Sequence, residues 1–143
     1  MPAEYSNIAV QTVAEDGNIT FLDGSRACTK GYITHRDGSG TFRLKGANNT
    51  CKTIYRVTFD ANIAVAVGGT VGEISVSLSE DGEIVGNAVG VVTPAAIGDF
   101  FNVSFTTFIT IPCGCCVSVA IRNTSDGTAI DVENANIVFD RVA

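Results

Sequence analysis

Apolar and polar residues alternate strictly between residues 53 and 63. The residues of one set are Tyr55, Val57, Phe59, Ala61 and Ile63, and those of the other are Arg56, Thr58, Asp60 and Asn62. A period of two places these sets on opposite faces of an extended chain, so the pattern predicts a strand with one face in the core and one in water.

Similar alternation recurs along nearly the whole chain, and no stretch has a convincing helical period. We predict about ten strands, at residues 6–14, 18–22, 30–34, 40–46, 53–66, 71–79, 83–92, 100–111, 115–123 and 134–142. Asp81-Gly82 is the strongest hairpin signal, because Asp-Gly suits a two-residue turn that needs positive φ. The chain is therefore predicted to be all-β: a single antiparallel β-sandwich or jelly roll over residues 1–143. Residues 1–14 form either an N-terminal arm or an edge strand.

Two predicted strands have apolar or small residues on both faces, at residues 84–92 and 135–139. Such residues indicate that both faces of the strand are covered. In a two-layer sandwich the outer face can be covered by a loop or terminus of the same chain, or by an identical neighbouring subunit.

Composition gives further support to subunit association. Charged residues make up 17% of the chain, below the ~25% that is usual for soluble proteins. Either another subunit covers apolar surface, or Gly, Thr, Ser and Asn supply the polar surface. The net charge is −6 and the nine Lys and Arg residues are scattered. This argues against binding to nucleic acid or to an anionic membrane, both of which require clustered basic residues.

Five cysteines are the first candidates for chemistry: Cys28, Cys51, Cys113, Cys115 and Cys116. A zinc site needs four ligands from correctly placed elements, and no second pair of ligands accompanies the cluster at residues 113–116. We expect these cysteines to be structural, with Cys115, Val117, Val119 and Ile121 facing the core. Cys28 and Cys51 flank two predicted strands, so a disulfide between them is the alternative to free thiols.

No arrangement of residues indicates catalysis. His35 is the only histidine, and the chain has no Gly-x-Ser-x-Gly nucleophile elbow. We expect His35 to be a solvated residue at a strand end or an interface residue. Most of the carboxylates lie in or beside turns, where they bond the backbone. The sequence therefore predicts no enzyme activity, no catalytic or cofactor-binding residue and no metal.

Five segments carry a resemblance to a known group: residues 31–40, 55–63, 92–96, 113–116 and 132–142. Through them, residues 31–143 resemble small structural proteins encoded by tailed phages and prophages of gut Firmicutes. The strand at residues 55–63 is also similar to one in the jelly rolls of the C1q and tumour necrosis factor group, which form compact trimers. No site residue is implied by either resemblance.

The resemblance implies a virion component, above all a homotrimeric decoration protein bound to the major capsid protein on the capsid exterior. The alternatives are the trimeric head domain of a phage fibre or tail appendage that binds the host surface, and a bacterial surface or spore-coat module. The N-terminus shows no secretory signal, so we expect assembly in the host bacterial cytoplasm. We expect residues 2–13 either to contact the capsid or to form an ordinary edge strand.

Overall fold

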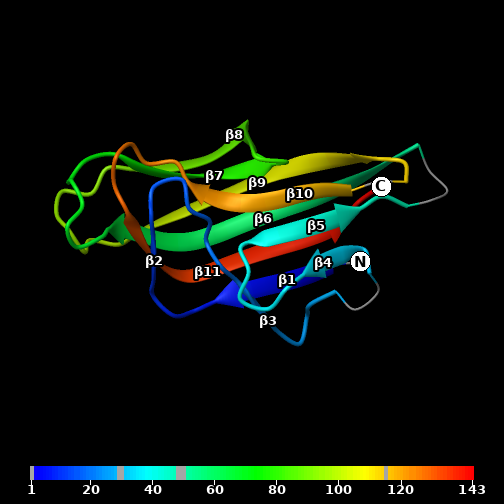
Figure 1. Ribbon diagram of the computed structural model, residues 1–143, viewed down its shortest axis with the longest axis horizontal. Helices are drawn as coiled ribbons and strands as arrows, with labels where there is room; N and C mark the ends of the chain where they lie inside the picture. Colours follow the sequence, from blue (N-terminus) through cyan, green and yellow to red (C-terminus); the bar gives the residue numbers. More distant parts are fainter. Residues whose placement is uncertain (1, 29–30, 48–50, 115) are drawn as a thin grey trace.

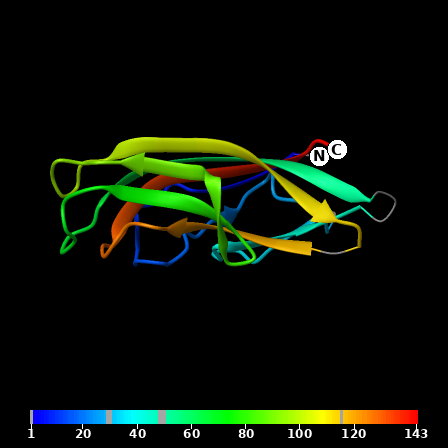
Figure 2. The same cartoon turned by 90° about the horizontal axis from the view of Figure 1, so that it is seen from above.

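The computed structural model describes residues 2–28, 31–47, 51–114 and 116–143. Two antiparallel sheets pack face to face as a jelly-roll sandwich (Figures 1 and 2). The first sheet has the order β3-β1-β11-β6-β9, with β2 paired to β11, and the second has the order β4-β5-β10-β7-β8. No helix occurs among the described residues, so none could cross a membrane.

Eleven strands are defined in the described part of the chain. Their bounds are β1 Pro2–Asn7, β2 Gln11–Val13, β3 Leu22–Asp23, β4 Ile33–His35, β5 Thr41–Lys45, β6 Lys52–Val65, β7 Ile74–Glu80, β8 Glu83–Val92, β9 Phe101–Pro112, β10 Cys116–Asn123 and β11 Ile130–Arg141. The all-β, antiparallel fold predicted from the alternation is confirmed. The two-residue hairpin is also confirmed, with Asp81 at φ 52° and Gly82 at φ 86°.

The first predicted strands differ from the structure. Residues 6–14 are not one strand, because β1 ends at Asn7 and β2 begins at Gln11. Most of 18–22 lies outside the sheets, where Asn18 makes only an isolated bridge to Arg122. β1 lies between β3 and β11 in the first sheet and buries Ala3 and Tyr5.

The core lies between the sheets and follows the alternation of β6. Tyr55, Val57, Phe59 and Ile63 are fully buried in β6, and Phe42 of β5 meets them from the opposite sheet. Burial of each large apolar side chain contributes roughly 1.5–3 kcal/mol, so this double layer of apolar side chains is the main source of stability.

The two sheets come closest at the side formed by the edge strands β8 and β9. A Cβ placed on Gly90 of β8 would lie 2.8 Å from the Cβ of Val103 in β9. Only glycine permits that approach, and the contact holds the edges of the two sheets together.

The N- and C-terminal strands are neighbours. Pro2 of β1 pairs with Asp140 of β11, and Ala143 accepts a hydrogen bond from the Ile54 N–H at 3.1 Å. Both termini therefore lie at one end of the sandwich, and the loops 66–73, 93–100 and 124–129 lie at the other (Figure 1).

Candidate functional site

The side of the sandwich between β8 and β9 exposes an unusual number of large apolar side chains. Val91 of β8 is 52% exposed and Phe101 of β9 is 47% exposed, and Ile84 and Val89 of β8 are also exposed. β8 and β9 are the edge strands of their sheets. We call Ile84, Val89 and Val91 on the outer face of β8, together with Phe101 and the partly buried Phe105 on the core-facing side of β9, the β8–β9 edge.

The β8–β9 edge is firmly attached to the core. The ring of Phe105 lies 5.3 Å from that of Phe59, centroid to centroid, and Val103 is buried against Gly90. Apolar patches of this kind on a rigid sheet mark contact surfaces on soluble proteins.

The two runs with apolar residues on both faces have different environments. In β8 no described loop covers Val89 and Val91, so the outer face is open. In β11, Ala135, Ile137 and Phe139 are buried in the core, and Val138 on the outer face is only half-buried.

The outer face of β6, β9 and β11 is mostly polar. Arg56 Nη2 donates to Asp140 Oδ2 at 2.8 Å, and the hydroxyls of Thr58 and Thr106 lie 3.3 Å apart. Phe108, in register with Arg56, is 62% exposed within this polar surface. A neighbouring chain placed here would meet both charged and aromatic groups.

The cysteines are spread over the molecule. Cys28, Cys51, Cys113 and Cys116 form no disulfide with one another, so the alternative of a Cys28–Cys51 disulfide is not what the structure contains. Arg43 Nη2 lies 3.0 Å from the Cys116 sulfur. Cys115 lies outside the described residues, whereas Val117, Val119 and Ile121 face the core as predicted. The described residues contain no group of three or more His, Cys, Asp or Glu that could hold a metal.

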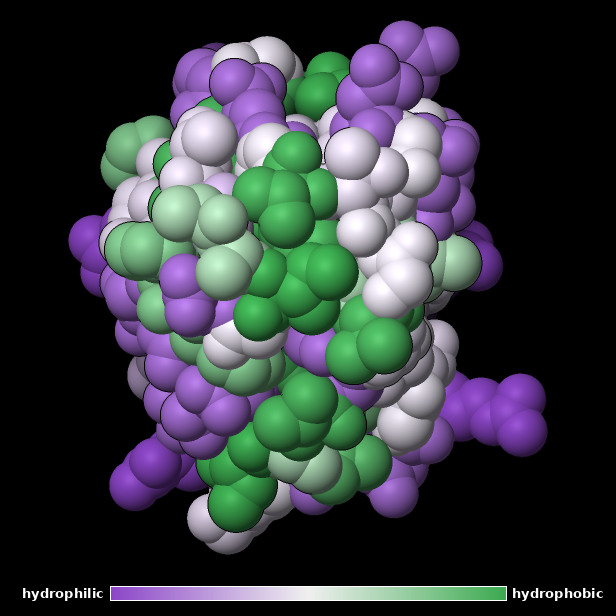
Figure 3. Space-filling model, turned by 90° about the vertical axis from the view of Figure 1, so that its left-hand side faces the viewer, coloured by the Kyte–Doolittle hydropathy of each residue, from purple (hydrophilic) through white to green (hydrophobic). Residues whose placement is uncertain are grey.

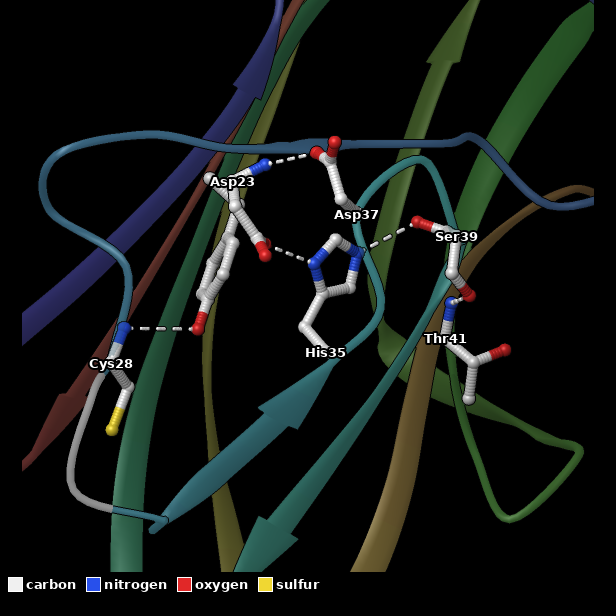
Figure 4. A network of polar contacts seen from close by, with 7 residues as sticks. Asp23, Cys28, His35, Asp37, Ser39 and Thr41 are labelled. Atoms are coloured by element: carbon white, nitrogen blue, oxygen red, sulfur yellow. Dashed lines mark hydrogen bonds and ion pairs between the residues drawn. The ribbon is translucent and has the colours of Figure 1, made fainter.

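His35 differs from the expectation: its side chain is only 1% exposed, so the prediction of a solvated histidine is wrong. The imidazole stacks on Phe42 with ring centroids 4.3 Å apart, and the edge of Tyr5 lies 4.9 Å away. Its Nδ1 is 2.6 Å from Asp23 Oδ1, and its Nε2 is 2.8 Å from the backbone carbonyl oxygen of Ser39 (Figure 4).

This geometry indicates the charge of His35. A carboxylate and a carbonyl oxygen can only accept hydrogen bonds, so both ring nitrogens have to donate. With Asp23 as a carboxylate, both contacts fit an imidazolium form of the ring, and we expect this form in the folded protein. Asp37 completes the network, because its Oδ1 accepts the Asp23 N–H at 2.8 Å (Figure 4).

The His35 network ties β1, β3 and β4 together. Burial raises the pKa of the Tyr5 phenol, whose oxygen accepts the Cys28 N–H at 3.2 Å. A catalytic histidine needs a free nitrogen facing a substrate, and both nitrogens of His35 are occupied. The arrangement is structural.

Other titratable groups also have structural explanations. Burial raises the pKa of Tyr55, whose hydroxyl donates to the Lys45 carbonyl at 3.0 Å. Burial, followed by the neighbouring Asp81 carboxylate, raises the pKa of Glu80 at the end of β7.

The fold is shared with solved structures at low sequence identity. The tumour necrosis factor Eiger from S. frugiperda superposes with a TM-score of 0.72 at 14% identity, covering 100% of this chain and 92% of that one. Murine APRIL superposes with a TM-score of 0.68 at 7% identity, covering 99% of this chain and 100% of that one. The globular domain of zebrafish complement 1qA superposes with a TM-score of 0.63 at 14% identity, covering 99% of this chain and 94% of that one.

The predicted likeness to the C1q and tumour necrosis factor jelly rolls is therefore confirmed as a likeness of fold. No protein-family model and no curated protein matches the sequence.

Proposed function

We propose that the chain is a homotrimeric structural protein of a tailed-phage virion, which decorates the capsid exterior and carries no enzyme activity. The observation that carries the proposal is the apolar β8–β9 edge on a complete jelly-roll domain. The jelly-roll fold shared with C1q and tumour necrosis factor domains supports the trimer. The virion assignment rests on the resemblance of residues 31–143 to phage structural proteins.

Trimer formation follows from the geometry of a single apolar edge. When the edge of each subunit packs on a different surface of the next, the contact is heterologous and can close into a ring, for which the trimeric arrangement proposed here has three copies. When the edge packs on itself, the contact is isologous and stops at a dimer. The ring also matches the threefold positions of an icosahedral shell.

Light scattering on the purified protein tests the assembly. We expect three times 14.9 kDa. Val89→Asp should dissociate the trimer, because an unpaired charge in an apolar contact costs several kcal/mol. Val67→Asp is the matched control, since Val67 is 91% exposed in a turn away from the β8–β9 edge. A wild-type monomer or dimer at micromolar concentration would contradict the proposed trimer.

Attachment to a capsid would use multivalency. Three copies bind three equivalent sites at once, so the second and third contacts are effectively intramolecular and weak contacts sum to tight binding. We assign the capsid contact to residues 2–13. Within them, the loop between β1 and β2 exposes Ile8 at 79% and Val10 at 58%.

The test of this contact is co-sedimentation with undecorated capsids of the phage that encodes the chain. Deletion of 2–7 is unsuitable, because it removes Tyr5 from the core. We expect the double variant Ile8→Ser, Val10→Ser to remain a trimer and to lose capsid binding, whereas Val142→Ser should bind like the wild type. If the double variant still saturates capsids, residues 2–13 are not the anchor.

The second candidate is the head domain of a fibre or tail appendage that binds the host surface. The placement of both termini at one end favours it, because a stalk at that end leaves the opposite loops free. Mass spectrometry of purified capsids and tails separates the two: recovery only with tails would replace decoration by the fibre head. A bacterial surface or spore-coat module would be found in neither.

A further inference from the structure

Three loops at the end opposite the termini are joined into one surface. Gly98 N–H donates to the Val65 carbonyl at 3.2 Å, which ties loop 93–100 to the start of loop 66–73. Thr70 N–H donates to Thr128 Oγ1 at 3.3 Å, which ties loop 66–73 to loop 124–129. We call residues 66–73, 93–100 and 124–129 the apical surface.

The apical surface exposes large apolar side chains. Val67 is 91% exposed at a tight turn closed by the Gly69 N–H bond to the Ala66 carbonyl, and Val71 and Ile97 are each close to half exposed. Seen end-on, apolar side chains form a band down the middle of this face with hydrophilic side chains on both sides (Figure 3). Gathered apolar side chains of this kind on otherwise polar loops indicate a contact surface.

A cavity of about 450 Å³ opens beside the apolar band. Val71 forms part of its wall, Ser75 and Thr124 supply hydroxyls, and Glu73 and Asp126 supply carboxylates. The volume lies within the ~300–1,000 Å³ range of ligand pockets.

The polar wall of the cavity is fixed before any partner arrives. Thr124 Oγ1 lies 2.8 Å from Ser75 Oγ and 2.9 Å from Ser77 Oγ, and Ser75 N–H donates to Ser125 Oγ at 3.0 Å. The loop above it is held at Gly69, where an added Cβ would lie 2.4 Å from Thr128 Oγ1. A preorganised wall lowers the entropic cost of binding.

All charges on the apical surface are negative. Its three loops contain Glu73, Asp99 and Asp126 and no Lys or Arg. Among the described residues, no side chain forms an ion pair or hydrogen bond with the carboxylate of Glu73 or Asp126. Two carboxylates without a counter-charge, at the border of exposed apolar residues, complement a cation carried on an apolar segment.

We propose that the apical surface docks a partner protein through a lysine or arginine side chain flanked by apolar residues. The cation enters the cavity between Glu73 and Asp126, and the flanking apolar side chains lie on Val67 and Val71. Negative potential also favours encounter with basic partners and disfavours anionic ones. The proposal requires neither a capsid nor the trimer, so it can fail or succeed independently of the proposed function.

The test uses synthetic peptides and the full-length protein. The probes are acetyl-Gly-Val-X-Val-Gly-amide peptides in which X is lysine, arginine, norleucine or glutamate, titrated into ¹⁵N-labelled protein and followed by amide chemical shifts. We expect the lysine and arginine peptides to shift amides of residues 70–75 and 124–128. The norleucine and glutamate peptides should bind more weakly, and added salt should weaken the lysine peptide.

Variants assign the binding to residues. Glu73→Gln and Asp126→Asn should each lower the affinity for the lysine peptide by about fivefold, the upper range for an exposed charge pair. Glu83→Gln, an exposed glutamate in the β7–β8 hairpin, is the charge-matched control. Val71→Ser should lower the affinity for all four peptides. Val142→Ser should not, although Val142 is 43% exposed, close to the 45% of Val71.

Three results would overturn the proposal. The first is equal binding of the lysine and norleucine peptides, or shifts away from the apical surface. The second is an effect of calcium chloride at about 1 mM, the concentration range in which extracellular calcium modules bind. If calcium shifted the same amides and displaced the lysine peptide, the cavity would be a metal site. The third is self-association that Val67→Ser abolishes, which would make a second copy the occupant.

Discussion

His35 shows how a single residue joins distant parts of the chain. Its imidazole ring contacts Asp23 and Ser39 through its two nitrogens and stacks on Phe42. His35→Phe keeps an aromatic ring at this position but leaves the Asp23 carboxylate and the Ser39 carbonyl without their donor. We expect it to lower the free energy of unfolding by about 1 kcal/mol, since the Asp23 side chain is 38% exposed and water can replace part of the lost contact. Denaturant unfolding measures the loss.

A double-mutant cycle isolates the ion pair from the packing. Asp23→Ala should be destabilising in the wild type and nearly neutral in the His35→Phe background, because the interaction is already lost there. Equal losses in the two backgrounds would show that His35 and Asp23 are not coupled. A long-range ¹⁵N spectrum in which only one ring nitrogen of His35 carries a proton would contradict the imidazolium assignment.

Glu80 makes stability depend on pH. Burial, and then Asp81, raises its pKa in the folded protein above the ordinary value of 4.5. The folded state therefore holds this proton more tightly than the unfolded state, and stability falls as pH rises from that ordinary value through the folded pKa. Glu80→Gln should be more stable than the wild type at about pH 7, and this advantage should disappear at about pH 3.

Thermal unfolding at the two pH values measures the difference. Glu73→Gln is the control, because Glu73 is exposed and its carboxylate has no described partner. An advantage of Glu80→Gln that persists unchanged in acid would rule out titration of Glu80 as its cause.

The sequence carries little information about the burial of single polar residues. His35 lies next to the Asp37-Gly38 turn in the sequence, which predicted exposure. What buries it are Asp23, 12 positions away, and the ring of Tyr5 in β1. Local pattern does not reveal such partners, and neither does it reveal that Glu73 and Asp126 share a cavity.

At the scale of elements, Gly90 controls how closely β8 approaches β9. Gly90→Ala would place a Cβ 2.8 Å from the Val103 Cβ, so β8 would have to move outward and the β8–β9 edge would change shape. We expect a loss of about 1–3 kcal/mol, as for overpacking in a core, together with a weaker trimer. Gly86→Ala in the same strand is the control, because nothing lies within 4 Å of its added Cβ.

Thermal unfolding measures the loss of stability of Gly90→Ala, and light scattering measures the weakening of its trimer. A Gly90→Ala protein with the stability and mass of Gly86→Ala would show that the close approach of β8 to β9 is not required.

Long strands were predicted well and short ones were not. β6, β8 and β9 are each ten or more residues long, and the period of two in β6 and β9 extends over enough residues to be recognised with certainty. β1 was missed at Pro2 to Tyr5 because too few residues precede it to establish a period. β3 is two residues long and exists only because it pairs with β1. The apolar residues on both faces of β8 indicated from the sequence that its outer face makes a contact. They did not identify the surface that it contacts.

At the scale of the whole molecule, the proposed trimer makes folding stability depend on concentration. If burial of the β8–β9 edge stabilises only the assembled state, mass action raises the melting temperature as protein concentration rises. We expect this for the wild type and not for Val89→Asp. Scanning calorimetry over a hundredfold range of concentration measures it, and a melting temperature of the wild type that does not change would mean that folding is independent of assembly.

The pairing of Pro2 with Asp140 places the beginning and the end of the chain side by side in adjacent strands. A short glycine linker should therefore close the backbone into a circle without disturbing β1 or β11, and the circle can be reopened between Val67 and Gly68, where the turn is exposed. In such a circular permutant both termini lie at the apical end of the sandwich instead of the opposite end. A fused peptide or anchor would then leave from the apical loops, and the face that bears residues 2 and 143 would point outward.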